Sequence, residues 1–298
     1  MNDAITIFQQ NVGRGEVASD LLHNHTRYIN ADSMKCLQIN LNRSTMELQL
    51  MYATAAEADI DVLIVSEPPR SATTATRWNS SLDNSCAIIV TSSANLVPSS
   101  TGSGQGYAWA IIGSVLMVSC YCTPNCSPFE FFAFLDEVER AIREVSGPSN
   151  GIVLAGDFNA KSPEWGSTML DYKGQALGAL IGSLGLSVEN IGTMPTFSRR
   201  NQSSIIDVTF STRVRISGWR VDADTESLSD HRYIYFDVNS ALDCLSIGRS
   251  ESNNQRNCIR GWSFRKVNEG RLIDSINENV HLIEGQIVNG TSASVGAL

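Results

Sequence analysis

Short apolar runs and apolar stripes with helical spacing follow one another from residue 35 to residue 238. Bounded apolar runs are typical of buried strands, whereas apolar residues three and four positions apart mark one face of a helix. We predict helices around Leu48, Met51 and Ala55, over residues 129–145 and over residues 174–184. We predict strands at residues 36–40, 61–66 and 86–91, two paired strands within residues 107–122, and further strands at residues 152–155, 205–211, 216–221 and 231–238.

This order of elements is rich in strands and has few long helices. Because each sheet must bury an apolar face against another layer, we expect sheets packed in layers with helices outside. Acidic and amide residues recur where the predicted strands end, which is the edge at which open α/β folds bind their ligands. The pattern therefore predicts a functional site assembled from strand ends.

The composition is that of a folded soluble protein, with 42% hydrophobic and 18% charged residues in a chain of 298. The net charge of −9 argues against a protein that holds nucleic acid by its overall charge. It does not exclude a nuclease, because a metal site needs carboxylates and the bound cation reverses their local charge. A nucleic-acid substrate would have to be held by a local basic edge.

The cysteine pattern and the apolar runs favour an intracellular protein without a membrane span. An odd count of seven cysteines suggests reduced thiols. Cys120, Cys122 and Cys126 could form half of a zinc site, but no second cluster completes it, so we interpret them as strand cysteines. No signal peptide is visible, and the longest apolar run, residues 107–122, is shorter than the ~20 residues that span a bilayer.

Several polar residues stand where phosphodiester chemistry would need them. Hydrolysis of a phosphodiester requires a cation, a base and help for the leaving oxygen, and hard divalent cations prefer oxygen ligands. Taken singly, each candidate has a plain alternative as a turn, a loop carboxylate, a structural histidine or an ordinary strand aromatic. The candidates are Glu67 after an apolar run, Tyr121 near a strand end, Asp157 and Asn159 after a buried strand, Asp207 within an apolar strand, and the sequence Ser229-Asp230-His231.

In their order along the chain these motifs resemble the endonuclease/exonuclease/phosphatase superfamily, the superfamily of DNase I and the apurinic/apyrimidinic endonucleases. The resemblance implies an α+β fold: a four-layered α/β-sandwich with two packed, mostly antiparallel or mixed β-sheets and helices outside. It covers roughly residues 35–238 and rests on Gln38-x-Asn40, Ser66-Glu67-Pro68, Tyr121-x-x-Pro124, Gly156-Asp157-Phe158-Asn159, Ser204-x-x-Asp207-Val208-Thr209 and Ser229-Asp230-His231.

A narrower resemblance is to the endonuclease domains of LINE-type (non-LTR) retrotransposons. In that group the domain nicks one DNA strand, and the exposed 3′ end primes reverse transcription. The resemblance therefore implies a Mg²⁺-dependent DNA endonuclease, with Mn²⁺ as an alternative cation and double-stranded DNA as substrate. It rests on residues 157–167, Gly174-x-x-Leu177, Asn190-x-Gly192-x-x-Pro195-Thr196-Phe197 and Ser204-x-Ile206-Asp207-Val208-Thr209-Phe210.

The resemblance also implies a role for each residue. Asp207 would fix and polarise His231, which would act as base or phosphate stabiliser, and Asp157 would orient or activate water. The remaining implied roles fall into three groups: metal binding by Glu67, Asn40 and Asp230; contact with the phosphate or leaving group by Asn159 and Tyr121; and DNA contact by Ser229 and by a hairpin flanked by Thr196 and Ser204, with Arg199, Arg200, Asn201 and Gln202 at its tip.

Two alternatives remain open at this point. One is another phosphoesterase of the same superfamily, acting on phospholipid, inositol phosphate or RNA tails; the other is an inactive DNA-binding remnant of a mobile element. For the hairpin tip, the alternative is a solvated basic turn. The family implies action on DNA in the nucleus, and we expect a monomer.

The domain prediction has three parts. We expect the nuclease domain at residues 35–239, an N-terminal extension at residues 1–34, and a linker with a truncated following region at residues 240–298, where the reverse transcriptase of a full-length element is not recognisable. The N-terminal extension holds a partial duplicate of the first motif, so Asn11 is an alternative to Asn40. We favour Asn40 because its strand leads directly into the following helix and the Glu67 strand.

Overall fold

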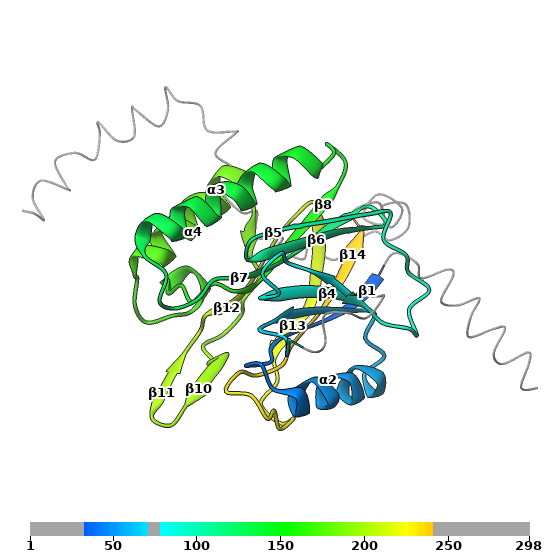
Figure 1. The fold of residues 1–298 in the computed structure, drawn as a ribbon, viewed down its shortest axis with the longest axis horizontal. Coiled ribbons are helices and arrows are strands. Elements are labelled where there is room, and N and C mark those ends of the chain that lie inside the picture. Colours follow the sequence, from blue (N-terminus) through cyan, green and yellow to red (C-terminus); the bar gives the residue numbers. More distant parts are fainter. Residues whose placement is uncertain (1–32, 71–77, 241–298) are drawn as a thin grey trace, which may run out of the picture. The chain divides into compact units, whose positions relative to one another are not determined.

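A computed structural model describes residues 33–70 and 78–240 of the chain (Figure 1). Within these residues two six-stranded sheets pack face to face, and three α-helices lie outside them. The N-terminal extension with Asn11 and the predicted linker after residue 240 lie outside the described residues. No helix in residues 33–70 or 78–240 is long and apolar enough to cross a membrane.

The first sheet has the strand order β13-β14-β1-β2-β4-β3. Its central strands β1 and β2 are parallel, and helix α2 (Thr45–Glu57) connects them; the other pairs are antiparallel. Parallel neighbours need such a crossover connection. The strands are β1 (Ser33–Asn40), β2 (Val62–Ser66), β3 (Trp78–Ser80), β4 (Cys86–Val90), β13 (Val214–Val221) and β14 (Ile234–Ser240).

The second sheet has the order β5-β6-β7-β8-β12-β9 and the same central design. Strands β7 and β8 are parallel and are connected through helix α3 (Pro128–Val145), while their neighbours are antiparallel. The strands are β5 (Ser100–Gly104), β6 (Tyr107–Ile112), β7 (Val115–Tyr121), β8 (Gly151–Asp157), β9 (Ser187–Val188) and β12 (Asp207–Thr212).

Three buried apolar clusters separate four layers, as the sequence predicted. One cluster, which includes Val62, Met117 and Phe236, lies between the sheets. A second holds α3 and helix α4 (Tyr172–Leu184) against the second sheet, and a third holds α2 against the first sheet. Figure 1 shows α3 and α4 on one side of the sandwich and α2 on the other.

The helix boundaries follow from local sequence. In α3 the hydroxyl of Ser127 accepts a hydrogen bond from the Glu130 backbone, and the Glu130 carboxylate accepts one in return from Ser127, which together form a capping box. Pro128 occupies the first turn, where its missing N–H costs nothing. Helix α4 begins after Asp171, two residues before the predicted start, because the Asp171 side chain caps it.

The sequence missed three short strands, β3, β5 and β9. Strand β5 has the composition of a loop, Ser-Thr-Gly-Ser-Gly, but it pairs with β6. A Cβ atom added to Gly102 would lie 2.4 Å from the ring of Trp109 on the neighbouring strand. Glycine is therefore used here to make room for an aromatic ring, a reason that local propensity does not reveal.

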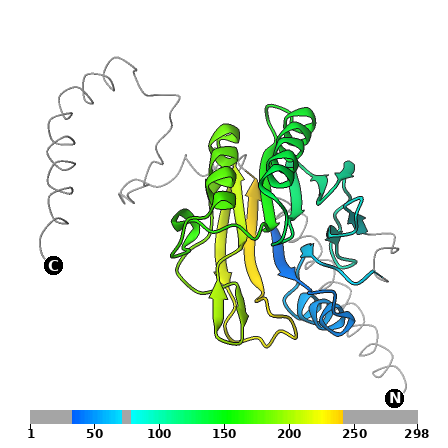
Figure 2. The same ribbon diagram turned by 60° about the vertical axis from the view of Figure 1, so that its left-hand side comes forward.

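The last strand is also corrected, because β14 begins at Ile234 and not at residue 231. His231 makes only an isolated antiparallel bridge with Phe197, so it lies in the loop before the strand. Phe197 belongs to a hairpin of β10 (Phe197–Arg199) and β11 (Gln202–Ser204), which projects from one end of the sandwich (Figures 1 and 2). The sequence predicted this hairpin correctly.

Candidate active site

Strand ends from both sheets meet at one edge of the sandwich. Asn40 is the last residue of β1 and Glu67 directly follows β2, so the parallel pair places both at the same edge. Asp157 ends β8, and the antiparallel register of β8 and β12 sets it opposite Asp207. The loop before β14 adds His231. The residues therefore converge because of strand direction and register.

Asp207 and His231 form a buried pair at this edge. The Nδ1 atom of His231 lies 2.8 Å from Oδ2 of Asp207. Burial alone would lower the pKa of His231, but the charge and hydrogen bond of Asp207, together with Asp157 and Glu67, outweigh it and raise that pKa to about 9. The imidazole is therefore oriented by a carboxylate on one side, which leaves Nε2 for other contacts.

That second nitrogen faces Asp157. His231 Nε2 lies 3.9 Å from Asp157 Oδ2. Burial and the nearby charge of Asp207 raise the pKa of Asp157 to about 7, although His231, the Asn159 backbone and the Asn40 side chain act in the opposite direction. The raised pKa reflects mainly the burial of this carboxyl and, after it, the nearby charge of Asp207.

Asn40 connects Asp157 to Glu67. Its Nδ2 atom donates to Asp157 Oδ2 at 2.9 Å and to Glu67 Oε2 at 3.2 Å, and its Oδ1 accepts from the Asn42 backbone at 2.8 Å. The amide nitrogen thus lies between two carboxylates. Beside them, burial and its hydrogen bond and charge contact with Glu67 raise the pKa of the Tyr121 hydroxyl, which keeps this phenol protonated.

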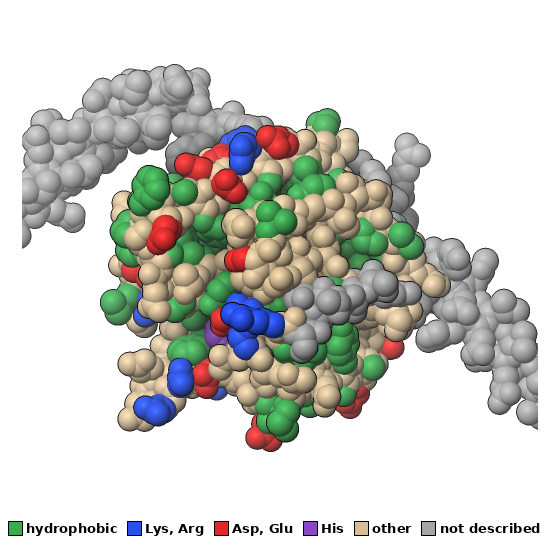
Figure 3. All heavy atoms as spheres, viewed as in Figure 1, with side chains coloured by type: hydrophobic (Ala, Val, Ile, Leu, Met, Phe, Trp, Pro, Cys, Tyr) green, Lys and Arg blue, Asp and Glu red, His purple; other side chains and the backbone are tan. Residues whose placement is uncertain are grey.

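Asp230 lies at the border between this cluster and the hairpin. Its Oδ2 is 3.5 Å from Nε of Arg199 on β10 and accepts from the Asn42 side chain at 3.5 Å. The Asp230 carbonyl accepts a hydrogen bond from the backbone N–H of Ser198, which is also in β10. Figure 3 shows basic and acidic side chains side by side around the purple histidine on this face.

Asn159 is held in a tight turn directly after β8. It has φ of 47°, its backbone N–H donates to Asp157 Oδ1 at 2.9 Å, and its Nδ2 donates to the Cys122 carbonyl at 3.0 Å. These bonds fix the side chain next to Asp157. The glycine before the turn is required, because a Cβ on Gly156, whose φ is 147°, would lie 1.9 Å from the Cys120 carbonyl oxygen.

Two residues predicted to contact DNA, Thr196 and Ser229, use their hydroxyls within the protein, and a third, Ser204, uses its backbone carbonyl. Thr196 is buried, and its hydroxyl accepts hydrogen bonds from the backbones of Ile206 and Asp207. Ser229 donates to the Asn40 carbonyl at 2.7 Å and accepts from His231 N at 3.2 Å. The Ser204 carbonyl accepts from Thr196 N. These contacts hold the hairpin and the His231 loop against the strand ends.

Sequence reasoning missed Glu47 as part of the site's support. Its side chain is fully buried: Oε1 accepts from the Tyr233 hydroxyl at 2.6 Å, and Oε2 accepts from the Leu228 backbone at 2.6 Å. The pair Ser44-x-x-Glu47 is the signal of a capping box, in which Glu47 would bond back to Ser44. Glu47 instead binds Leu228 and Tyr233, the residues at the two ends of the segment that carries His231.

One group of three described residues could hold a metal ion, and Glu67 offers further oxygen donors at the same edge. One atom each from Asp157, Asp207 and His231 lies within 4.8 Å of the others, and all three side chains are buried. However, His231 is already bonded to Asp207, and a hard cation prefers oxygen donors, which Glu67 also offers at this edge. The grouping of the Asp157, Asp207 and Glu67 carboxylates at this edge fits a bound cation.

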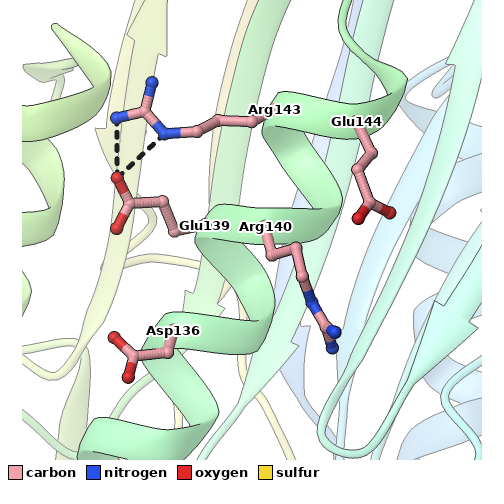
Figure 4. A pocket seen from close by; sticks show the side chains of 5 residues that line it. All are labelled: Asp136, Glu139, Arg140, Arg143 and Glu144. Carbon is pink, nitrogen blue, oxygen red and sulfur yellow. Dashed lines mark hydrogen bonds and ion pairs between the residues drawn. The ribbon is translucent and has the colours of Figure 1, made fainter.

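A hollow outside this site lies on α3 (Figure 4). It has a volume of about 380 Å³ and is lined by Asp136, Glu139, Arg140, Arg143 and Glu144. Arg143 donates two hydrogen bonds to Oε1 of Glu139, which pairs these two charges with each other. The hollow contains none of the candidate site residues.

Comparisons with known proteins agree with this architecture. Residues 115–235 match the family described as Endonuclease-reverse transcriptase. The endonuclease domain of TRAS1, a telomere-specific non-LTR retrotransposon, is 28% identical with a TM-score of 0.60, over 70% of this chain and 99% of that domain. No match was found among curated protein sequences.

Two more distant structures share the fold. An AP endonuclease from Archaeoglobus fulgidus is 13% identical with a TM-score of 0.56, over 68% of this chain and 98% of its own. A 3′–5′ exonuclease from Neisseria meningitidis is 17% identical with a TM-score of 0.52, and the match covers 69% of this chain and 100% of the exonuclease chain.

The fold and the site thus define the class of protein: a phosphodiesterase of the endonuclease/exonuclease/phosphatase superfamily. Within that class, residues 115–235 match the Endonuclease-reverse transcriptase family and the chain is 28% identical to the endonuclease domain of a non-LTR retrotransposon, in line with the resemblance of the sequence motifs.

Proposed function

We propose that the protein is a Mg²⁺-dependent endonuclease that nicks one strand of DNA and leaves a 3′-OH primer for reverse transcription. The observation that carries the proposal is the continuous series of contacts from Asp207 through His231, Asp157 and Asn40 to Glu67. The series joins a proton-handling pair to a group of oxygen donors at one edge, which is the combination that phosphodiester hydrolysis requires.

The buried pair handles the proton. Asp207 holds the His231 ring through Nδ1, so the other ring nitrogen, Nε2, faces Asp157. In this proposal Asp157 orients the attacking water, and its raised pKa suits it to take a proton near neutral pH. His231, whose pKa is raised by Asp207, stabilises negative charge on the phosphate or serves as the base.

The cation is held by Glu67, Asn40 and Asp230. Bound Mg²⁺, or Mn²⁺ in its place, would neutralise charge on the phosphate oxygens. Asn40 currently presents Nδ2 to the carboxylates, so it would ligate a cation only after its amide turns to present Oδ1. Tyr121, kept protonated beside Glu67, can donate a hydrogen bond to the phosphate or the leaving oxygen, and Asn159 binds the scissile phosphate.

Double-stranded DNA is the substrate that the surface supports. The β10–β11 hairpin projects beside the site and carries Arg199, Arg200 and Asn201 at its tip. Arginine is favoured in a narrow minor groove, where the negative potential is strongest. The 28% identity with the endonuclease domain of TRAS1, a non-LTR retrotransposon, supports action on chromosomal DNA in the nucleus.

A plasmid-nicking assay tests the proposal. The purified chain should convert supercoiled plasmid to the relaxed form with Mg²⁺ and stop when EDTA is added. His231→Ala and Asp157→Ala should abolish nicking while DNA binding persists. Arg140→Gln, which changes a surface arginine paired with Glu137 on α3, is the matched control and should nick like the parent.

The result separates the candidate functions. Full nicking by both site variants would overturn the assignment of the site. Release of phosphate from other phosphoesters without any plasmid nicking would favour another phosphoesterase of the superfamily. Binding of DNA without nicking by the parent protein would favour an inactive remnant.

A further inference from the structure

Arg43 is a basic residue at the edge of the site that neither the motifs nor the hairpin includes. It lies in the turn between β1 and α2 with φ of 59°. This left-handed conformation costs a residue with a Cβ atom ~1 kcal/mol, and glycine would adopt it freely. At such a strained position the side chain should make an interaction that offsets the cost of the backbone conformation.

The Arg43 guanidinium is held in place by two backbone carbonyls. Nη1 donates to the Pro68 carbonyl at 3.3 Å and to the Asn84 carbonyl at 3.0 Å. Pro68 lies shortly after the end of β2, and Asn84 lies shortly before the start of β4. The two hydrogen bonds therefore fix the Arg43 side chain to the ends of two further strands. The charged group is thereby oriented before any ligand arrives, which lowers the entropic cost of binding.

The same group lies next to the candidate chemistry. Nε of Arg43 is 3.7 Å from Glu67 Oε1, and its positive charge also acts on the Tyr121 hydroxyl. Its side chain is 40% exposed, and among the described residues no hydrogen bond uses Nη2. An exposed ion pair at this distance adds little to stability, so the pair with Glu67 alone does not account for the arginine.

Arg43 and Arg199 border the acidic cluster on two sides. Arg199 lies beside Asp230 on the hairpin side, whereas Arg43 lies beside Glu67 on the side of the β1–α2 turn. A chain with net charge −9 needs locally placed cations to hold a polyanion. Arg43 thus adds positive charge beside Glu67, as Arg199 does beside Asp230.

We propose that Arg43 binds a backbone phosphate of the substrate strand adjacent to the scissile phosphate, beside Glu67 and the β1–α2 turn. This inference rests on the proposed function. Arg43 is a substrate-binding residue in this scheme: its Nη2 and exposed edge contact the phosphate, while Nη1 stays on the two carbonyls.

The salt dependence of DNA binding tests the proposal. The logarithm of the binding constant falls with the logarithm of salt concentration by ~0.9 for each phosphate contacted in duplex DNA. Arg43→Gly removes the charge and adopts the left-handed backbone without strain, whereas Arg43→Lys keeps the charge. Both variants lose the guanidinium group that donates to the two carbonyls, but only Arg43→Lys keeps a positive charge, which is the property that the salt dependence reports.

The measurement is anisotropy of a labelled DNA duplex with the full chain and Mg²⁺, in a His231→Ala background that keeps the duplex intact. Arg43→Gly should reduce the slope by about 0.9 and weaken binding about tenfold at low salt, and Arg43→Lys should keep the parent slope. Arg140→Gln, on the far helix α3, should change neither. Thermal melting of each variant checks that it folds.

An unchanged slope in Arg43→Gly would overturn the inference, as would an equal reduction in Arg43→Lys, which would assign the effect to the lost carbonyl anchors. Failure of the proposed function looks different: the parent protein itself would not nick plasmid, whether or not it binds the duplex.

Discussion

The Nδ1 atom of His231 lies 2.8 Å from Oδ2 of Asp207, and both side chains are buried between the hairpin and the strand ends. The two residues are brought together by the loop before β14 and the start of β12. Asp207 therefore sets both the orientation of the imidazole ring and its affinity for a proton.

Asp207→Asn should reduce the nicking rate by a factor of roughly 10² to 10⁴, the range for loss of acid–base function. The amide has the same shape but carries no charge, so the raised pKa of His231 should fall toward its ordinary value. Single-turnover nicking against pH, together with NMR titration of the histidine, checks both effects. A variant with normal rate and unchanged histidine titration would contradict the role of Asp207.

The stability of the metal-free protein should fall as pH rises. The folded state raises the pKa of His231 from 6.5 to about 9, so its contribution is complete below pH 6.5 and is lost as pH rises through 9. The raised pKa of Asp157 acts in the same direction, because folding also favours its protonated form. Denaturant unfolding in EDTA at a series of values from about pH 5 to about pH 9 measures how the free energy of unfolding changes with pH.

His231→Gln is the matched variant for this pH experiment. Glutamine can still donate a hydrogen bond to Asp207 but does not titrate, so the stability curve should flatten above neutral pH. A parent curve that rises with pH in EDTA would show that the sign is wrong.

Glu47 should stabilise the loop that carries His231. Glu47→Gln leaves either the Tyr233 hydroxyl or the Leu228 N–H without its carboxylate acceptor, and should cost about 2 kcal/mol in the free energy of unfolding. Tyr233→Phe removes one of the same hydrogen bonds and should cost a similar amount. Because the two changes break a shared contact, the double variant should lose less than their sum in denaturant unfolding.

Gly156 should not tolerate a side chain. In Gly156→Ala the new Cβ meets the Cys120 carbonyl oxygen of the neighbouring strand, and the φ of 147° is unfavourable for alanine. We expect a loss of about 3 kcal/mol or more, or no soluble protein. Gly182→Ala in α4, where nothing lies within 4 Å, is the control and should be neutral or stabilising by about 0.5–1 kcal/mol. Equal melting temperatures for the two variants would contradict this account.

The sequence alone determined the layered fold and which strand ends lie at one edge of it. Apolar periodicity reports local secondary structure directly, so the long helices and the central strands were predicted close to their observed bounds. Strand ends could be located from the same pattern, and they placed Asn40, Glu67 and Asp157 at one edge. The ordered motifs identified the superfamily because they combine these positions over most of the described chain.

The tertiary structure decided which side chains meet and what each one does. Glu47 has the spacing of a helix cap but bonds to residues far along the chain, and Ser229 turns its hydroxyl inward to Asn40 and His231. Strand β5 is a strand only because β6 supplies its partner. Such contacts join residues distant in sequence, so they depend on sheet register and layer packing, which no local pattern of hydrophobic and polar positions contains.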